Sequence, residues 1–286
     1  MNQGLQTLEE HIWEYFETHG RHDLPWRNSD TDGSFNAYYI MVSEIMLQQT
    51  QVARVIAKYH EFLALFPTVA SLAQAPLADV LKAWSGLGYN RRAKFLWQAA
   101  GMLHADYADT FPQTVDELVA LPGIGVNTAG AIAAYAFDRP VIFIETNIRT
   151  VFIHHFFADT DDVHDKQLAP LLQQAMDDIL AAQYPGRTPR TWYWALMDYG
   201  THLKQTVGNA SRRSKTYAKQ STFQGSKRQI RGQILRLLGA HEYSLAALRL
   251  EITDERLDQV LADLLQEEFI SYKHKSYHLS RSVIQF

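Results

Sequence analysis

The chain has 286 residues, 47% of them hydrophobic and 20% charged, which is enough for one large or several small globular domains with a proper core. The net charge of −4 argues weakly against a polyanionic partner, and the absence of cysteine excludes disulfides, thiolate nucleophiles, and zinc or iron–sulfur sites held by cysteine. No run approaches the roughly eighteen apolar residues of a membrane span, and the acidic, amphipathic start is unlike a secretory signal, so we expect a cytoplasmic protein.

The first two thirds of the chain predict helices almost throughout. Apolar residues follow helical spacing over residues 37–66, which predicts one helical run that Pro67 ends. Residues 68–84 predict a threonine-capped helix interrupted at Pro76, then a second helix. A short helix follows with Thr114 spaced three residues before a glutamate, as in a capping box. Further helices are predicted over 91–107, 127–137, 165–184 and 190–204.

The last third begins with a polar, basic segment. There is no acid between Asp198 and Glu242, where nine lysines and arginines fall, and a charge run of this kind is usually a solvated linker. Beyond it, three helical patterns over 229–240, 244–252 and 254–268 precede an alternating stretch, 269–280, that predicts a β-hairpin. This order is typical of a winged helix-turn-helix, although small accessory domains for packing or dimerisation share the shape.

The stretch "LPGIGVNTAG", residues 121–130, predicts a tight turn between two helices. Gly123 and Gly125 allow the turn and leave backbone amides unobstructed, and the following helix points its positive N-terminal end the same way. A plain turn would need no more than this. As an anion site, the stretch would suit one DNA backbone phosphate.

Taken together, "LPWR", "SEIMLQQTQV", "FPTVASLAQAPLADVLKAWSGLGY", "LPGIGVNTAGAI" and "ETNIRTV" resemble, in order and spacing, the blocks of MutY-type adenine DNA glycosylases. The resemblance covers roughly residues 10–205. It implies a mainly α, helix-hairpin-helix DNA glycosylase fold of two helical subdomains with a cleft between them, plus the small C-terminal winged-helix-like domain. The expected parts are residues 1–28 with 136–205 as one subdomain, 29–135 as a six-helix subdomain, 206–226 as a basic linker, and 227–286 as the winged-helix-like domain.

Glu44 is the only charged residue between Asp32 and Arg54, in a helical pattern that otherwise resembles core. A carboxylate in such surroundings has a raised pKa and suits a general acid. The resemblance implies that Glu44 protonates the adenine ring and helps to activate water. A surface glutamate on an amphipathic helix is the alternative.

Glu145 ends the apolar run "VIFI" and stands where the family has an aspartate. A carboxylate facing an oxocarbenium-like sugar is the expected catalytic device, but one extra methylene moves the head group by roughly 1.5 Å. The resemblance implies that Glu145 stabilises this charge, with Asn147 orienting it and Arg149 holding phosphate. Alternatively, Glu145 only stabilises the start of the following helix.

Other DNA contacts follow from the resemblance. Gln48, Gln49 and Tyr89 correspond to residues that fill the gap left by a flipped base, a step that costs a few kcal/mol; Tyr89 could instead be a core aromatic. Bifunctional relatives carry a lysine just after the hairpin glycine, whereas this chain has Val126 and Asn127, which predicts hydrolysis by water. The remaining expected DNA-binding residues are Leu121, Gly123, Gly125, Asn127, Thr128, Arg91, Arg212, Arg213 and Lys215.

The sequence departs from the family in two places. Many members bind a [4Fe–4S] cluster beside a basic loop, but residues 202–223 keep the charge without any cysteine, so we expect no cofactor. A Nudix-like domain that recognises 8-oxoguanine is also too large for the chain after residue 226. The adjacent His154 and His155 point apart on a helix, so no metal site is expected.

The sequence therefore predicts a monofunctional DNA N-glycosylase of base excision repair, acting as a monomer on adenine opposite 8-oxoguanine or guanine in double-stranded DNA. Two alternatives stay open: a glycosylase of the same fold for another damaged or mismatched base, and a lesion-binding protein whose catalysis has decayed. In a bacterial cell the protein would associate with the nucleoid when bound to DNA.

Overall fold

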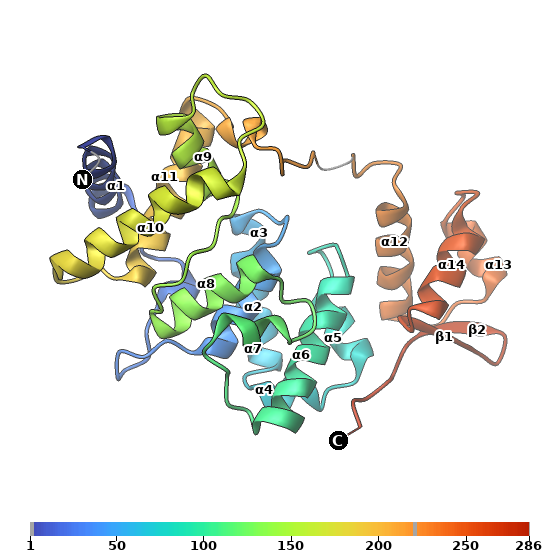
Figure 1. Cartoon of the computed structure of the whole chain (residues 1–286). Coiled ribbons are helices and arrows are strands. Elements are labelled where there is room, and N and C mark those ends of the chain that lie inside the picture. The colour runs from blue at the N-terminus through green and yellow to red at the C-terminus, as the bar shows by residue number, and fades with distance from the viewer. Residues whose placement is uncertain (1–2, 220–221, 286) are drawn as a thin grey trace. The chain divides into compact units, whose positions relative to one another are not determined.

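A computed structural model describes residues 3–219 and 222–285, which are mainly helical (Figure 1). The chain forms two compact units. The first unit comprises Met1–Ile40, Gln113–Val119 and Ile124–Lys219, and the second comprises Met41–Pro112, Ala120–Gly123 and Gln220–Phe286. In the described part of the chain, no helix combines the length and the apolar character needed to cross a membrane.

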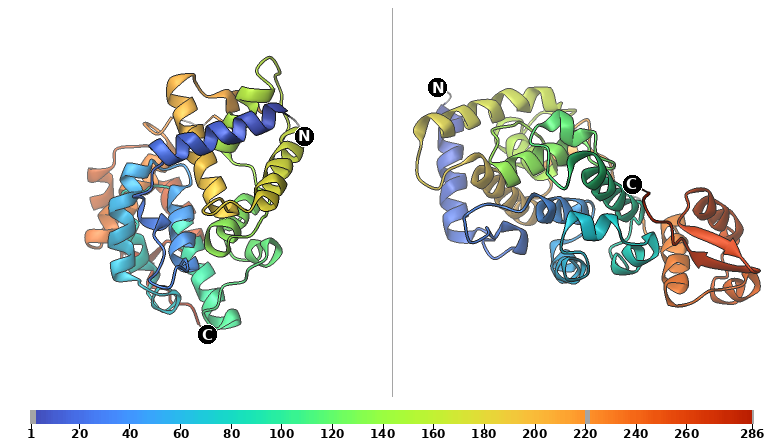
Figure 2. Two further views of the ribbon diagram at one scale, coloured as in Figure 1. Left: turned by 90° about the vertical axis from the view of Figure 1, so that its left-hand side faces the viewer. Right: turned by 90° about the horizontal axis from the view of Figure 1, so that it is seen from below.

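The first unit is entirely helical in its regular structure. Helix α11 lies at its centre, packed against α1, α8, α9 and α10, and the long α1 and α10 can be followed in Figure 2 by their blue and yellow colours. Its core includes the buried Trp13 and Trp192, whose ring centroids are 5.5 Å apart. The elements are α1 (Gln3–His19), η1 (Pro25–Arg27), α7 (Val115–Val119), α8 (Val126–Phe137), α9 (Thr146–Phe156), α10 (Asp165–Ala182), α11 (Pro189–Thr206) and the 3-10 helix η2 (Ala210–Arg213).

The second unit combines a helical lobe with the C-terminal segment. Helix α6 packs against α4 and α5, around the fully buried Trp84, Phe62 and Leu72. The lobe contains α3 (Val52–Leu65), α4 (Val69–Ala73), α5 (Leu77–Ala83), α6 (Arg91–Tyr107) and most of α2 (Ala37–Leu47). The C-terminal segment contains α12 (Lys227–Ala240), α13 (Leu245–Glu251), α14 (Leu257–Gln266), β1 (Ile270–Lys273) and β2 (Ser276–Leu279).

Local signals in the sequence are confirmed at several helix starts. Thr68 caps α4 through its side chain, which accepts from the Ser71 amide at 3.1 Å, and Pro76 separates α4 from α5. Thr114 and Glu117 form the predicted pair at the start of α7, with a 2.5 Å hydrogen bond between their side chains. A short polar side chain at these positions satisfies amides that the helix itself leaves open.

The prediction of one helical run over residues 37–66 is wrong. Helix α2 ends at Leu47 and α3 starts at Val52, because Gln49 takes a left-handed conformation with a φ of 55°. The break also changes which residues after it are buried. The buried face of α3 consists of Val55, Tyr59 and Phe62. Gln49 is exposed and does not belong to an apolar stripe.

The three helices and the hairpin predicted at the C-terminus are confirmed. Strands β1 and β2 pair antiparallel from Ile270 opposite Leu279 to Lys273 opposite Ser276. The connecting residues His274 and Lys275 both have positive φ, as a two-residue hairpin turn requires. A winged-helix-like arrangement results.

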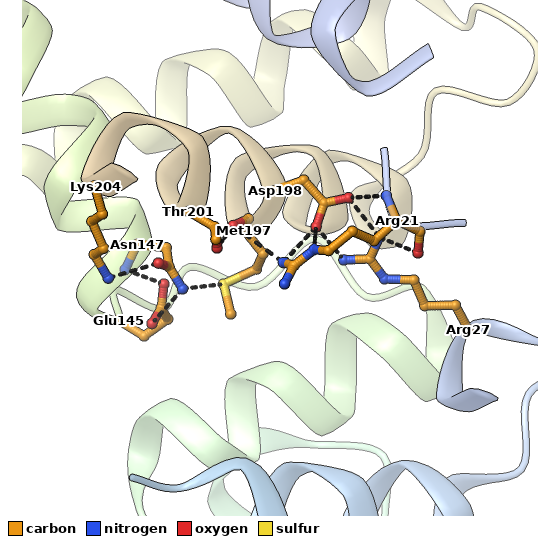
Figure 3. A network of polar contacts seen from close by, with 8 residues as sticks. All are labelled: Arg21, Arg27, Glu145, Asn147, Met197, Asp198, Thr201 and Lys204. Atoms are coloured by element: carbon orange, nitrogen blue, oxygen red, sulfur yellow. Dashed lines mark hydrogen bonds and ion pairs between the residues drawn. The ribbon is translucent and has the colours of Figure 1, made fainter. Parts of the chain in front are cut away.

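The N-terminal segment is tied to α11 by a buried ion-pair network around Asp198, shown in Figure 3. Arg27 donates two hydrogen bonds to the Asp198 carboxylate at 2.8 and 2.9 Å. Arg21 adds its backbone amide at 2.8 Å and its Nε at 2.7 Å. Burial alone would raise the pKa of Asp198, but the hydrogen bonds and charges of the two arginines outweigh it and hold the pKa below the ordinary value.

We predict that Asp198→Asn destabilises the protein by about 3–5 kcal/mol near pH 7, because it leaves a buried guanidinium without its counter-ion. The depressed pKa of Asp198 means that this stabilisation is present above about pH 4, the ordinary aspartate pKa, and is lost as the pH falls through the lower pKa of the folded state. Urea unfolding at pH 7 and pH 3 measures both effects. The exposed Asp161→Asn is the control, and an equal loss in both variants would contradict the prediction.

Candidate functional site

Glu145 is delivered by a short extended segment that the core holds firmly. The side chains of Phe143 and Ile144 are buried, and Phe143 stacks on Tyr193 with ring centroids 4.1 Å apart. The Tyr193 hydroxyl donates to the Val141 carbonyl at 2.7 Å and accepts from the Phe143 amide at 3.4 Å. The buried residues before Glu145 therefore fix the backbone position from which its side chain extends.

Glu145 is the N-cap residue of α9. Its Oε1 accepts from the backbone amides of Asn147 at 2.5 Å and Ile148 at 3.0 Å, and its Oε2 accepts from Asn147 Nδ2 at 3.4 Å. The alternative interpretation, that Glu145 stabilises the start of the following helix, is therefore correct. A capping carboxylate is also oriented by fixed amides, so the same geometry can serve a catalytic group.

Lys204, which sequence analysis did not select, joins this group. Its Nζ donates to Asn147 Oδ1 at 2.7 Å, so Asn147 bridges the amine and the Glu145 carboxylate (Figure 3). Burial raises the pKa of Glu145 above its ordinary value, while the charge of Lys204 and the two helix amides oppose that rise. Burial also lowers the pKa of the Lys204 amine. The available signal was helical spacing, since Met197, Thr201 and Lys204 recur on one face of α11.

The approach of α9 to α11 depends on Gly200. A Cβ at this position would lie 2.6 Å from the Asn147 carbonyl oxygen and 2.7 Å from Asn147 Cβ. Met197 Sδ, two turns before Lys204 on α11, lies 3.6 Å from Asn147 Nδ2. Both ends of the Asn147 amide are therefore set by α11.

Arg149 is also on α9, but it forms an ion pair within the first unit. Its Nε and Nη2 donate to the two carboxylate oxygens of Asp165 at 2.7 and 2.6 Å. The phosphate-binding role that the resemblance implies therefore requires Arg149 to share or exchange this partner.

The other candidate acid, Glu44, lies on α2 in the second unit. Its side chain is partly exposed, while Val42, Ile45 and Met46 around it are buried. The helix carries no other charged residue.

The candidate wedge residues occupy two turns of the second unit. Gln48 and Gln49 follow α2, and Tyr89 precedes α6 with a left-handed φ of 46°. Left-handed backbone at a residue other than glycine is uncommon and costs about 1 kcal/mol or more, so it persists only where neighbouring structure enforces it.

Arg92, which the sequence motifs do not single out, holds both turns. The guanidinium is buried, and its Nη1 donates to the carbonyls of Ile45, Met46 and Gln48 at 2.7–2.8 Å. Its Nη2 donates to Thr50 Oγ1 at 3.1 Å and to the carbonyls of Leu87 and Gly88 at 3.1 and 3.0 Å. Burial lowers the pKa of Arg92 to about 10, which leaves it charged at neutral pH.

The two hairpin glycines, Gly123 and Gly125, have different structural roles. Gly123 has a φ of 76°, and a Cβ there would meet Phe95 at 2.5 Å. Gly125 has an extended backbone, open space around it, and no side chain to cap α8. Leu121 anchors the hairpin in the core, Asn127 is exposed and Thr128 is half-buried. The start of α8 thus combines exposed glycine with a helix N-terminus.

Comparison with known proteins identifies the family. A family model described as HhH-GPD superfamily base excision DNA repair protein matches residues 42–175. An adenine DNA glycosylase of Mycolicibacterium smegmatis is 34% identical over 279 residues, which cover 87% of this chain and 89% of that protein. The chain belongs to the adenine DNA glycosylase family. A second member, from Mycobacterium tuberculosis, is 33% identical over 85% of each chain.

Solved structures agree with the fold of this family. A thermostable thymine-DNA glycosylase has a TM-score of 0.60 at 22% identity, covering 74% of this chain and 95% of that one. A trapped endonuclease III–DNA intermediate has a TM-score of 0.54 at 19% identity, covering 71% and 85%. The predicted helix-hairpin-helix glycosylase fold is confirmed.

Residues 202–223 do not fit an iron–sulfur cluster, because none of them is a cysteine. Within the segment predicted as a linker, η2 is held instead by Asn209, whose Oδ1 accepts from Ser211 Oγ at 2.6 Å and from Thr150 Oγ1 at 3.3 Å. Two backbone hydrogen bonds then join Val163 to the chain at residues 213 and 215. Ordinary hydrogen bonds thus shape the basic loop.

We predict that Gly200→Ala lowers the rate of the family's reaction by about a hundredfold, since the added methyl displaces Asn147 and misplacements of about 1 Å have effects of this size. Single-turnover kinetics measure the rate. Gly232→Ala is the matched control, because that helical glycine has open space and its substitution is expected to stabilise slightly. Equal rates for the two variants would refute the steric argument.

A second prediction concerns the basic loop, defined as Arg212, Arg213 and Lys215, all of which are exposed. Replacing all three by Gln should weaken duplex binding and reduce the slope of log K against log salt by up to about 0.9 per lost phosphate contact. Titrations of labelled duplex at several salt concentrations give this slope. Arg249→Gln, which removes an exposed charge paired with Asp258, should leave it unchanged.

Proposed function

We propose that this protein is a monofunctional DNA N-glycosylase that hydrolyses the bond between adenine and deoxyribose in a mispair. The observation that carries the proposal is the oriented carboxylate of Glu145 in a chain that aligns with adenine DNA glycosylases over most of their length. We further propose adenine opposite 8-oxoguanine or guanine as the substrate, in double-stranded DNA bound by one protein monomer in the cytoplasm.

Glu44 is the proposed general acid. Protonation of the adenine ring turns a poor leaving group into a good one, and a carboxylic acid on an apolar helix is suited to hold that proton. Once the glycosidic bond breaks, the Glu44 carboxylate accepts a proton from the attacking water. The products are free adenine and an abasic site.

Glu145 is the proposed stabiliser of the oxocarbenium-like sugar, with Asn147 as its orienting partner. Its Oε1 is directed by two helix amides, as expected of a carboxylate at a helix N-cap. The Oε2 atom carries the charge that would face the sugar, held by a longer contact to Asn147 Nδ2.

Water is the proposed nucleophile, and no cofactor takes part. Val126 and Asn127 offer no amine after the hairpin. Lys204 is the one amine that contacts this group of residues within the described chain, and its hydrogen bond to Asn147 favours a role in orientation. If Lys204 instead attacked the sugar, strand cleavage would occur without alkali, which the assay below detects.

The DNA contacts proposed for the flipped state are Gln48, Gln49 and Tyr89 as the wedge, with the start of α8 and the basic loop on phosphates. The left-handed turns at Gln49 and Tyr89 support the wedge assignment, because strained backbone concentrates at functional sites. The uncapped N-terminus of α8 supports phosphate binding.

The test is a single-turnover assay on labelled duplexes with A opposite 8-oxoguanine, G or T, each read with and without hot alkali. We expect alkali-dependent cleavage at A. Glu44→Gln should remove at least about a hundredfold of the rate and Glu145→Gln about 10²–10³-fold, with duplex binding retained in both.

Three other outcomes have distinct meanings. Cleavage at another base would favour a glycosylase of the same fold with a different target. Tight lesion binding with no base release from any duplex would favour a protein whose catalysis has decayed. Full activity in Glu145→Gln would leave Glu145 as a helix cap only.

A further inference from the structure

The C-terminal segment, residues 222–285, has its own core, but its α14 is not a basic helix. Ile234, Leu248, Val260 and Leu264 are fully buried within it. In a helix-turn-helix the second helix enters the major groove, and here that helix is α14. It contains no lysine or arginine, and it exposes Asp258, Gln259, Ala262 and Gln266. An aspartate on this face repels phosphate, so α14 is poorly suited to enter the groove.

The same segment is docked on the α5–α6 lobe of the second unit through Glu267. This carboxylate accepts two hydrogen bonds from Arg91, at 3.0 and 2.7 Å, and two from Arg231, at 3.0 and 2.7 Å. The hydrogen bonds from Arg91 are the main reason that the pKa of Glu267 falls to about 2. Lys94 Nζ donates to the Glu267 carbonyl at 2.6 Å.

The chain after the hairpin adds a second line of contact. The Leu77 amide at the start of α5 donates to the Ser282 carbonyl at 3.0 Å. Gly101 in α6 has no side chain, which leaves room for Ile284 against the helix. Docking therefore involves the end of α14 and the residues after the hairpin.

Docking brings Arg228, in the first turn of α12, onto Tyr89. Arg228 Nη1 donates to the Tyr89 hydroxyl, and the guanidinium carbon lies 4.8 Å from the ring centroid. The Arg92 guanidinium lies 5.6 Å from the same ring. A side chain on a left-handed turn is thus held by two cations, one of which comes from the C-terminal segment.

We propose that Arg228 is a positioning residue for base extrusion: the C-terminal segment, docked through Glu267, presents Arg228 to Tyr89 and holds the ring in the orientation from which it inserts into DNA. The inference rests on the proposed glycosylase function. Hydrogen bonding and cation–π attraction both act on the ring, so the loss of the Arg228 guanidinium leaves the ring less constrained.

The experiment measures extrusion separately from chemistry. The full-length protein is mixed with a duplex carrying 2-aminopurine beside the target adenine, and the fluorescence rise on unstacking is followed by stopped flow. Single-turnover base release is measured on the same variants. Arg228→Met should slow extrusion and base release by about tenfold, and Arg228→Lys should restore part of the loss.

Controls separate positioning from other roles. Arg249→Met changes an exposed arginine of the same segment and should behave as wild type. Tyr89→Phe removes the hydroxyl, and adding Arg228→Met to it should cost less than Arg228→Met alone costs in the wild type. Glu267→Gln weakens the docking without altering Tyr89 or Arg228, so it should slow extrusion in the same direction.

Several results would overturn the proposal. Wild-type extrusion in Arg228→Met would remove the role, and faster extrusion would make the contact a restraint on Tyr89. A reduced salt slope for undamaged duplex in Arg228→Met would show that Arg228 binds phosphate instead. If the wild type extrudes a base but releases no adenine, the glycosylase proposal fails while this one is still decided by the fluorescence.

Discussion

The position of Glu145 and Asn147 depends on the close packing of α9 against α11, which only a glycine at position 200 permits. Because α11 is rigid and regular, residues on its successive turns act together. Met197 and Lys204 hold the two ends of the Asn147 amide, while Asp198 on the neighbouring face fixes the N-terminal segment. One helix therefore determines where α9 begins. The position of the Glu145 carboxylate, which caps α9, is determined in the same way.

Arg92 has the corresponding role in the second unit. A planar guanidinium presents five donors in a fixed fork, which a lysine cannot match. Here the guanidinium donates to carbonyls at the end of α2 and in the turn before α6. It therefore links two turns that are far apart in sequence. The left-handed conformations of Gln49 and Tyr89 are stable because these carbonyls are held. Burial of this charged group is tolerated because Nη1 and Nη2 have carbonyl and hydroxyl acceptors, although the buried Nε has none.

Sequence reasoning was reliable where the determining interaction is local and failed where it is distant. Caps, prolines and the hairpin turn mark element ends within four residues, so most helices and the winged-helix-like segment could be predicted. The break after α2 could not, because apolar spacing continues through it and Gln49 is not a residue type that signals a left-handed turn. The partners of the site residues could not be predicted from the sequence either. The ion pair of Arg149 with Asp165 and the contact of Lys204 with Asn147 join separate helices, and no spacing rule specifies them.

Charge pairing explains how an acidic chain can present a DNA-binding surface. A net charge of −4 counts every side chain equally, but the field near a surface depends on which charges are neutralised by neighbours. Arg91 and Arg149 each share a carboxylate within the fold. By contrast, Arg212, Arg213 and Lys215 form no salt bridge with any residue in 3–219 or 222–285, and no acid lies near them in sequence. The basic loop therefore keeps its full charge for phosphate. Because hydrogen bonds from Asn209 and Val163 hold that loop in shape, its charge stays concentrated at one place without a cluster.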